Sequence, residues 1–463
     1  MGFSSFMGRR RVMEYIEITQ EIIQELIHSK QIKALKEVFE EYNIVNLAEI
    51  VGELTIEEAL FIFKVLNKNI TGEIFAYLPA SKQQRLISVL TGDQIKEILH
   101  NTYTDDIVDF LEELPANMVK DILKHASNQQ RAVINQLLSY PDNTAGSIMT
   151  TNYVELKEEH TVMEAMSEIK KSGGKAEQVD YCFVVDLNGC LIGIVSLRDI
   201  LFAPEDSVMD DLMHMDVISV KTNDDQEEAS SIMRKYDITV LPVLDTSNRL
   251  VGMITADDII DIIQDEATED IQKMGAITPI ETRYLDTRVG VIFKSRITWL
   301  LILMVTYALS SMIITSHQEL LAVYPALLAF LPMLMDTTGD AGSQALAMVV
   351  RGIVVDDLTI KDFFKVVWKE FAVATICGLC LFLVNMARMI LFVDSAGFAM
   401  ALVVSLTMFI LTVIAKLVGG VLPLIAILLK QDPASMASPI ITTVCDSLSL
   451  LIYFSLAIMI LGM

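Results

Sequence analysis

Hydrophobic positions follow two different patterns along the 463 residues of this chain. Beyond residue 290 the apolar positions merge into long stretches, at about 297–314, 320–349, 363–392, 398–429 and 437–462. A helix needs about 20 mostly apolar residues to cross a bilayer. We therefore predict a membrane domain of five helices over residues 285–463. The second stretch contains four helix-breaking residues: Pro325, Pro332, Gly339 and Gly342.

The first half of the chain has shorter apolar repeats. Between residues 15 and 140 they recur at helical spacing, as in Ile107–Leu111, and Pro79 and Pro115 stand at the beginnings of successive segments. Strand-like segments are scarce there. Residues 1–146 are therefore predicted to form an all-α, superhelical domain of short helices.

Residues 149–212 and 213–267 are two copies of one pattern, with a short extended segment, a helix, two strands and a second helix in each. The copies share one motif, which reads Gly193-Ile194-Val195-Ser196-Leu197-Arg198-Asp199 in the first copy and Gly252-Met253-Ile254-Thr255-Ala256-Asp257-Asp258 in the second. Such a repeat indicates paired modules, an α+β region that we place at residues 147–258. The pattern resembles tandem CBS domains, whose Gly-apolar-apolar-Ser/Thr-x-x-Asp motif binds adenine nucleotides.

That resemblance implies one set of nucleotide-binding residues. The hydroxyl and carboxylate positions are Ser196, Asp199, Thr255 and Asp258, with Arg198 for the phosphates and Tyr181 for the base. Many CBS pairs are structural only, so binding of ATP or another adenine nucleotide and a purely structural role both stay open.

Charge separates the chain into the same two halves. The net charge is −25 although the mean hydropathy is +0.47. Residues 291–463 carry nine basic and ten acidic residues, so 26 basic and 50 acidic residues lie in the first 290. This excludes a single globular domain, and the negative sign excludes a general affinity for nucleic acid.

The basic residues of the membrane half predict its orientation. They flank alternate connections: Lys294, Arg296, Arg351, Lys361, Lys365, Lys369 and Lys430. Residues 316–319 and 392–397 contain no Lys or Arg, so the positive-inside rule places the acidic half in the cytoplasm. Residues 12–27 lack the apolar core of a secretory signal. We expect a multi-pass protein of the plasma (inner) membrane.

Polar residues inside the apolar stretches indicate a cation pathway. Asp446 lies on one helix face with Ser438, Thr442, Ser449 and Tyr453, and the small polar segment from Pro332 to Gln344 suggests unwound backbone lining a cavity. Oxygen ligands without His or thiolate suit Mg²⁺ or Ca²⁺. One Asp446 per chain is too few for a divalent site, so we expect a two-fold dimer sharing one pore. A structural Asp that joins two helices is the alternative.

The segment after the repeat is strongly acidic. Asp258, Asp261, Asp265 and Glu269 are spaced by three, four and four residues, so they line one face of a connecting helix that we place at residues 259–284. Like charges at that spacing oppose a helix by about 0.2–0.5 kcal/mol per pair. The face is either solvated or neutralised by cations.

The order of these parts resembles the MgtE family of magnesium channels and transporters along essentially the whole chain. The most specific matches are residues 140–150 (Tyr-Pro-Asp-Asn-Thr-Ala-Gly-Ser-Ile-Met-Thr), residues 339–344, Asp432-Pro433-Ala434, Ser438-Pro439 and Thr442-Thr443-Val444-Cys445-Asp446. The resemblance implies a non-enzymatic homodimer that conducts Mg²⁺ through the bilayer. It also implies that cytosolic Mg²⁺ closes the pore by bridging acidic faces of the N-domain, the CBS pair and a connecting "plug" helix.

Site residues follow from the same resemblance. The pore set is Asp446, Thr442, Thr443 and Asp340. The sensor set is Asp258, Asp261, Glu266, Glu269 and Asp270 on the plug, Asp225 and Asp237 in the second CBS module, Glu73, Asp105 and Asp109 in the N-domain, and Asp432 between the last two spans.

Two positions leave alternatives open. The family usually has Asn where this chain has Asp340, an extra carboxylate that bears on affinity and selectivity among divalent cations. A CBS-regulated transporter of Co²⁺ or Mn²⁺ gated by adenine nucleotide is the second hypothesis. Lys416, within the fourth span, is predicted to pair with Asp340. An intramembrane aspartyl protease is disfavoured because Thr337 stands where the Gly-x-Gly-Asp motif of those enzymes requires glycine.

Overall fold

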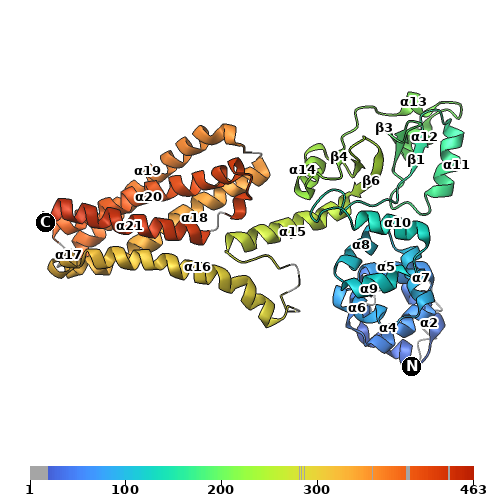
Figure 1. Ribbon diagram of the computed structural model, residues 1–463, viewed down its shortest axis with the longest axis horizontal. Helices are drawn as coiled ribbons and strands as arrows, with labels where there is room; N and C mark the ends of the chain where they lie inside the picture. The colour runs from blue at the N-terminus through green and yellow to red at the C-terminus, as the bar shows by residue number, and fades with distance from the viewer. Residues whose placement is uncertain are drawn as a thin grey trace, which may run out of the picture. The chain divides into compact units, whose positions relative to one another are not determined.

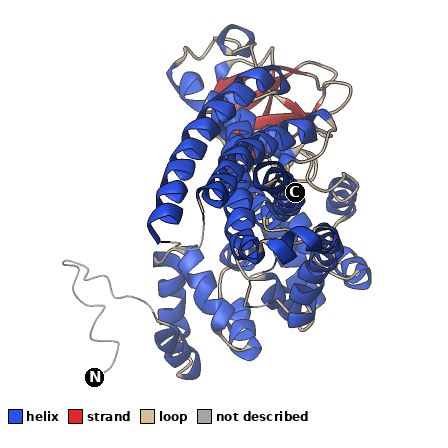
Figure 2. Ribbon diagram, turned by 90° about the vertical axis from the view of Figure 1, so that its left-hand side faces the viewer, coloured by secondary structure: helices blue, strands red, loops and turns tan. Residues whose placement is uncertain are grey.

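The computed structural model describes residues 19–462, apart from residues 281, 283, 286, 357, 393–396, 436 and 437. The chain divides into two compact units, Met1–Ile263 and Gln264–Met463, and each is described by itself. The basic segment at residues 1–11 lies outside the described residues. In Figure 2 the strands, coloured red, gather in one small region, and the rest of the described chain consists of helices joined by loops and turns.

The first part of unit 1 is built from short helices (Figure 1). They are α1 (Gln20–His28), α2 (Ile32–Glu41), α3 (Ile44–Glu53), α4 (Ile56–Val65), α5 (Lys68–Ala76), α6 (Ala80–Ile87), α7 (Gly92–Asn101), α8 (Thr104–Glu112), α9 (Ala116–Leu123) and α10 (Asn128–Leu137). Pro79 and Pro115 precede α6 and α9, because proline needs no hydrogen-bond partner at a helix start. The all-helical first domain is confirmed.

The second part of unit 1 contains the two predicted modules. The first comprises β1 (Glu155–Lys157), α11 (Val162–Ser172), β2 (Tyr181–Val185), β3 (Leu191–Ser196), α12 (Leu197–Phe202) and α13 (Met209–Leu212). The second comprises β4 (Val220–Lys221), α14 (Gln226–Tyr236), β5 (Val240–Leu244) and β6 (Leu250–Thr255). Both sheets have the order 1-2-3 within their module, with one parallel and one antiparallel pair, so the repeat in the sequence is a repeat in the fold.

The two modules are joined by exchanged contacts. Met149, at the start of the first, lies against Gly252 on β6, while Met213, at the start of the second, lies against Gly193 on β3. Backbone bridges Thr150–Met253 and Ile194–His214 reinforce both contacts. A Cβ atom at either glycine would come within 2.5 Å of the methionine sulfur, so each module's entry segment requires a glycine in the other.

Helix α15 (Ala256–Met274) follows directly after β6, and the boundary between the units lies within it. Unit 2 continues with α16 (Val289–Ser316), α17 (Gln318–Val323), η2 (Pro325–Phe330), α18 (Leu331–Asp356), η3 (Ile360–Asp362), α19 (Phe363–Phe392), α20 (Phe398–Leu428), η4 (Pro433–Ser435) and α21 (Ser438–Leu461). Among the described residues, four helices are long and apolar enough to span a membrane: α16, α19, α20 and α21. Helix α18 is the fifth long one, so the count of five spans stays a prediction.

The expectation of unwound backbone from Pro332 to Gln344 is wrong, because this whole segment lies within the continuous helix α18. Pro332 is in its first turn, where the missing N–H removes no helical hydrogen bond. Gly342 instead permits close packing, since a Cβ there would come within 2.7 Å of Ile441 on α21. The irregular turn lies earlier, in η2, where the carbonyl of Leu327 accepts a hydrogen bond of 3.1 Å from the Tyr453 hydroxyl.

Candidate cation sites

Asp446 is a buried carboxylate in the middle of an apolar helix. Its side chain is 5% exposed on α21, next to buried Cys445 and one turn before buried Ser449. No described residue donates a hydrogen bond to the Asp446 carboxylate or pairs with it as a cation. An unpaired buried charge costs several kcal/mol, so this position favours a cation as its partner.

The other predicted pore residues lie on α21, which also carries Asp446, and on α18. Thr442 packs against Gly339 of α18, and Thr443 is buried with its hydroxyl donating to the Pro439 carbonyl at 2.9 Å. Asp340 is on the exposed side of α18. The structure adds a carboxylate that the sequence analysis did not select, Asp336, whose charge acts on Asp446. The side chain of Ser438 is outside the described residues.

Lys416 has a different partner from the one predicted. Its ammonium group, 6% exposed on α20, donates to Gln344 Oε1 at 3.3 Å. Among described residues no ion pair joins Lys416 to Asp340, so that pairing is wrong. The charge of Glu370, whose side chain lies over Gly420, also acts on Lys416. The Lys416 side chain is thus held between α18 and α19.

The end of α15 forms an ion-paired contact within unit 2. Lys273 Nζ lies 2.5 Å from Glu269 Oε1 and 2.7 Å from Asp432 Oδ2, in the connection before α21. Burial, and then the charge of Asp432, raises the pKa of Asp270 to about 6, and Glu266 contributes further. Two carboxylates therefore pair with one ammonium group, and its charge also acts on the nearby Asp270. The structure brings Asp432 to the predicted plug helix through this lysine.

Three carboxylates from distant parts of the sequence meet in unit 1. Asp105 is in the first turn of α8, Glu177 follows α11, and Asp258 is in the first turn of α15. One carboxylate oxygen from each lies within 4.8 Å of the other two. Asp105 Oδ1 and Glu177 Oε2 are buried without a hydrogen-bond partner. Such a group of oxygen ligands suits a hard divalent cation, and we name it the Asp105–Glu177–Asp258 cluster.

Neighbouring hydrogen bonds fix this cluster in place. The Thr104 hydroxyl donates to Asn152 Oδ1 at 2.9 Å, and the Glu177 amide donates to the Asn152 carbonyl at 2.9 Å. The Thr255 hydroxyl donates to Asp258 Oδ2 at 2.5 Å. The helical domain, the first module and the start of α15 therefore each supply one carboxylate from an anchored position.

The cluster is surrounded by further acidic residues. Burial, and then the charge of Asp258, raises the pKa of Asp106 to about 6. Partial burial, followed by the charges of Asp106, Asp257, Glu73 and Asp261, raises the pKa of the Tyr77 hydroxyl. The structure thus places the predicted sensor residues Glu73 and Asp261 near the Tyr77 hydroxyl, together with Asp106 and Asp257.

Asp109 lies one turn beyond Asp105 and Asp106 on α8. Desolvation, followed by the charges of Asp106 and Glu112, raises the pKa of Asp109 to about 7. Its side chain nevertheless keeps an exposed surface, and solvent screens an exposed charge. The buried Asp105 is therefore the stronger ligand candidate on this helix.

Two predicted sensor residues lie at the two ends of α14. Asp225 caps α14, accepting a 2.8 Å hydrogen bond from the Glu227 amide. Asp237 ends the same helix in a left-handed conformation with φ of 52°. The described contacts do not bring either residue into the Asp105–Glu177–Asp258 cluster.

The nucleotide candidates gather at corresponding ends of the two sheets. Ser196 Oγ donates to Asp199 Oδ2 at 2.6 Å, and Tyr181 pairs with Ser196 in register at the start of β2. Arg198 is exposed beside them. In the second module Thr255 bonds Asp258 in the same way. Asp258 consequently belongs both to a nucleotide motif and to the acidic cluster.

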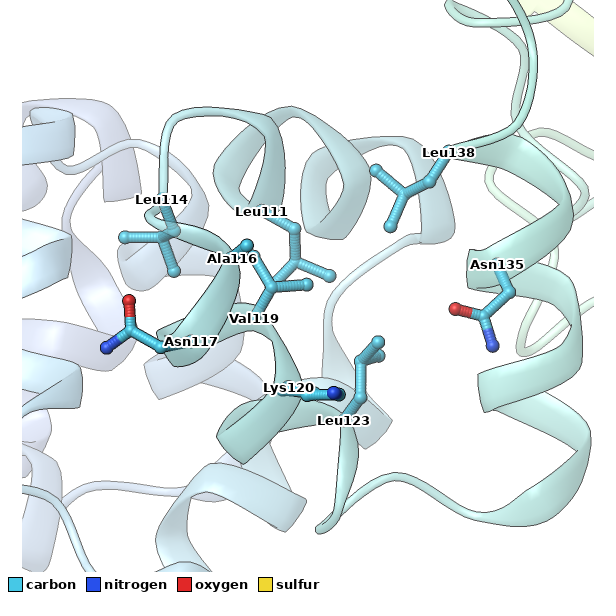
Figure 3. Close-up of a pocket in the computed structure, with 9 residues that line it drawn as sticks. All are labelled: Leu111, Leu114, Ala116, Asn117, Val119, Lys120, Leu123, Asn135 and Leu138. Carbon is cyan, nitrogen blue, oxygen red and sulfur yellow. The ribbon is translucent and has the colours of Figure 1, made fainter.

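A pocket of about 650 Å³ opens between α8, α9 and α10. Figure 3 shows its apolar lining, from Leu111 to Leu138, with Lys120 as the one charged side chain among the lining residues. This pocket lacks an acidic ligand, and so it does not extend the cation sites.

The acidic cluster predicts a pH dependence. Burial first, and then the charge of Glu177, raises the pKa of Asp105 well above 3.8, while burial raises the pKa of Glu177 from 4.5 to about 7. The folded state then retains protons that the unfolded state releases. Without metal, its stability should fall as pH rises from about 4 to about 7.

Hydrogen exchange of the α8 amides in the full-length chain, corrected for intrinsic rates, measures this trend. We expect local opening to become at least about tenfold more favourable across the window, which is about 1.4 kcal/mol. The double variant Asp105→Asn, Glu177→Gln should have a shallower profile, because Asp106 and Asp109 on the same helix still titrate in this range. A wild-type profile no steeper than that of the double variant would contradict the raised pKa values of Asp105 and Glu177.

Comparisons with known proteins agree with this arrangement. Residues 331–456 match the family model of a divalent cation transporter, residues 42–143 match the MgtE intracellular N domain, and residues 145–206 and 208–265 match CBS domains. The magnesium transporter MgtE of Thermus thermophilus is 33% identical over 94% of this chain and 97% of its own length. MgtE of Bacillus subtilis is 29% identical over 94% of this chain and 98% of its own length.

Solved structures resemble unit 1. The crystal structure of the soluble part of a magnesium transporter covers 54% of this chain and 98% of its own, with 30% identity and a TM-score of 0.51. The cytosolic domain of the Mg²⁺ channel MgtE, solved in complex with ATP, covers 52% of this chain at 33% identity, with a TM-score of 0.49. The full-length relatives are named as transporters, which points to a non-enzymatic role. This chain belongs to the MgtE family of magnesium transporters.

Proposed function

We propose that this chain forms a homodimeric Mg²⁺ channel or transporter of the plasma membrane, with its N-terminal domains in the cytoplasm. The observation that carries the proposal is Asp446, a buried carboxylate without a described partner inside an apolar helix. Two copies of Asp446 across a two-fold axis would attract a hydrated Mg²⁺, which sheds water reluctantly and needs only one or two carboxylates. Binding must remain weak enough for release.

Gating would follow from the acidic residues outside the membrane. Abundant Mg²⁺ would bridge the carboxylates of the Asp105–Glu177–Asp258 cluster and favour the closed state. When Mg²⁺ is scarce, repulsion among these carboxylates would separate the elements that supply them. The closed state must bind Mg²⁺ more tightly than the open state for this coupling to operate, and a site whose ligands come from three separate elements meets that requirement.

A second function has its own support. The hydroxyl–carboxylate pairs Ser196–Asp199 and Thr255–Asp258 match a nucleotide motif in both modules. Asp340, exposed on α18, adds a carboxylate where the family usually has Asn. A transporter of Co²⁺ or Mn²⁺ gated by adenine nucleotide is therefore the alternative.

Flux into liposomes separates the two functions. The purified full-length chain is reconstituted, and uptake of Mg²⁺, Co²⁺, Mn²⁺ and Ca²⁺ is measured singly and in competition, with and without ATP. We expect Mg²⁺ uptake that decreases as Mg²⁺ on the cytoplasmic side increases. Uptake of Co²⁺ or Mn²⁺ that Mg²⁺ does not inhibit, together with ATP-dependent gating, would favour the alternative.

Lys273 gives a prediction for the gate. Replacing Lys273 with Gln removes the ammonium group that pairs with Glu269 and Asp432, and leaves their carboxylates to repel one another. The end of α15 should then separate from the connection before α21 more readily. We expect half-closure to require severalfold more cytoplasmic Mg²⁺, measured as flux against its concentration.

Two further variants complete that experiment. Adding Asp432→Asn to Lys273→Gln removes one repelling charge and should restore part of the wild-type response. Lys171→Gln, which removes an exposed ion pair with Glu168, is the matched control and should behave as wild type. An unchanged Mg²⁺ response in Lys273→Gln would exclude this contact from the gate.

A further inference from the structure

Helices α18 and α21 pack in opposite directions, which places their polar residues at comparable levels. The Tyr453 hydroxyl bonds the Leu327 carbonyl, and Thr442 packs against Gly339. Asp446 is one turn beyond Thr442 toward Tyr453. The matching level on the other helix is one turn before Gly339, and Asp336 lies there.

Electrostatics agrees with this alignment. Asp336 is the charged residue whose field acts on Asp446. Asp446 is 5% exposed, whereas Asp336 lies on the exposed side of α18. No described residue donates a hydrogen bond to either carboxylate. A buried carboxylate without a donor and a second carboxylate near it repel each other unless a cation lies between them.

The exposed side of α18 extends this arrangement along the helix. Asp336, Asp340 and Gln344 are spaced by four residues, so they lie on one face with a rise of about 6 Å per step. Gln344 is the position where Lys416 donates its hydrogen bond. Carboxylates therefore occupy the first two of these positions, Asp336 and Asp340. The ammonium group of Lys416 is held at the third position, by Gln344.

A merely solvated Asp336 is the simplest alternative. It would account for the exposure of Asp336 but leaves the burial of Asp446 without a compensating charge. A carboxylate within a membrane helix normally faces a water-filled cavity or the interior of a bundle. Both positions are therefore consistent with one hydrated ion held between the two helices.

We propose that Asp336 and Asp446 of the same protomer jointly bind the transported divalent cation, so that Asp336 sets the affinity of the pore for its ion. This inference rests on the proposed transport function and adds a residue to it. Mg²⁺ retains several waters when one or two carboxylates bind it, so Asp336 contacts the ion through water or directly at the edge of its shell. A second carboxylate raises affinity and slows release, which must remain fast for conduction.

The test measures Mg²⁺ flux into liposomes containing the full-length chain. Asp336→Asn should raise the half-saturating Mg²⁺ concentration at least about tenfold while maximal flux is retained. Asp336→Glu keeps the carboxylate and should stay close to wild type. Asp356→Asn, an exposed carboxylate at the other end of α18 that pairs with Arg351, is the matched control. Size-exclusion profiles check that each variant is folded.

The outcomes distinguish this inference from the proposed function. If Asp446→Asn abolishes flux while Asp336→Asn matches wild type, the joint site is wrong and the transport function stands. If Asp446→Asn transports normally, both are wrong. A folded Asp336→Asn with reduced maximal flux but unchanged half-saturation would also overturn the inference, because Asp336 would then act outside ion binding.

Discussion

Replacing Asp446 with Asn is expected to abolish Mg²⁺ uptake in reconstituted liposomes. The substitution keeps the size of the side chain but removes the one charge buried in the middle of α21. Separating a buried charge from its ionic partner costs about 3–5 kcal/mol, which corresponds to a loss of affinity on the order of 100-fold or more. Flux should fall by a comparable factor, as measured with a fluorescent Mg²⁺ indicator inside the vesicles.

The control for this variant is Asp362→Asn. Asp362 is a carboxylate near the start of α19, paired with the exposed Lys365 at 2.8 Å, and its removal changes the net charge by the same amount. Uptake by this control should equal that of the wild type. Normal flux through folded Asp446→Asn protein would remove Asp446 from the pore.

The double variant Glu177→Gln, Asp258→Asn is expected to keep the pore open at cytoplasmic Mg²⁺ concentrations that close the wild type. The two substitutions leave Asp105 as the one carboxylate of the Asp105–Glu177–Asp258 cluster. A single carboxylate at this site has neither the charge nor the number of ligands to hold a divalent ion between three elements. Flux should then hardly change with cytoplasmic Mg²⁺, whereas maximal flux should be retained.

Asp121→Asn with Glu168→Gln is the control, because it removes the same number of charges from unit 1. Asp121 is exposed and Glu168 is partly exposed, and they pair with Lys124 and Lys171, so the response to Mg²⁺ should be unchanged. If the Mg²⁺ concentrations that close the wild type also close the double variant Glu177→Gln, Asp258→Asn, the cluster is not a sensor.

The cluster shows what periodicity could and could not predict. Asp258 was selected because its spacing with Asp261 places both on one helix face. Glu177 was missed because it lies in the irregular segment between α11 and β2, where no period indicates its direction. Its position beside α8 depends on Asn152, which accepts hydrogen bonds from both the Thr104 hydroxyl and the Glu177 backbone amide. Contacts between residues so far apart in the sequence leave no local signal.

Small residues in the membrane half misled the prediction in a different way. Proline and glycine in the segment around Gly339 suggested an unwound backbone, but glycine also allows close helix packing. The structure has the second arrangement, with Gly342 against Ile441 and Gly419 against the Gly342 carbonyl. Asp336 lies one turn before Asp340 and could have been selected on that spacing alone. Lys416 was predicted to pair with Asp340, but it donates to Gln344, which lies one helical turn further along α18.

The composition of α18 also bears on how the protein is made. Two carboxylates and Gln344 leave this helix outside the group of four that are apolar enough to cross a bilayer, and translocon scales place each mid-helix carboxylate at about 2.5–3.5 kcal/mol unfavourable. When α18 emerges from the ribosome, α20 and α21, which later enclose Gly342, have not yet been synthesised. We therefore expect stable insertion of α18 to wait for the last third of the membrane domain, so that truncation before α21 leaves α18 outside the lipid.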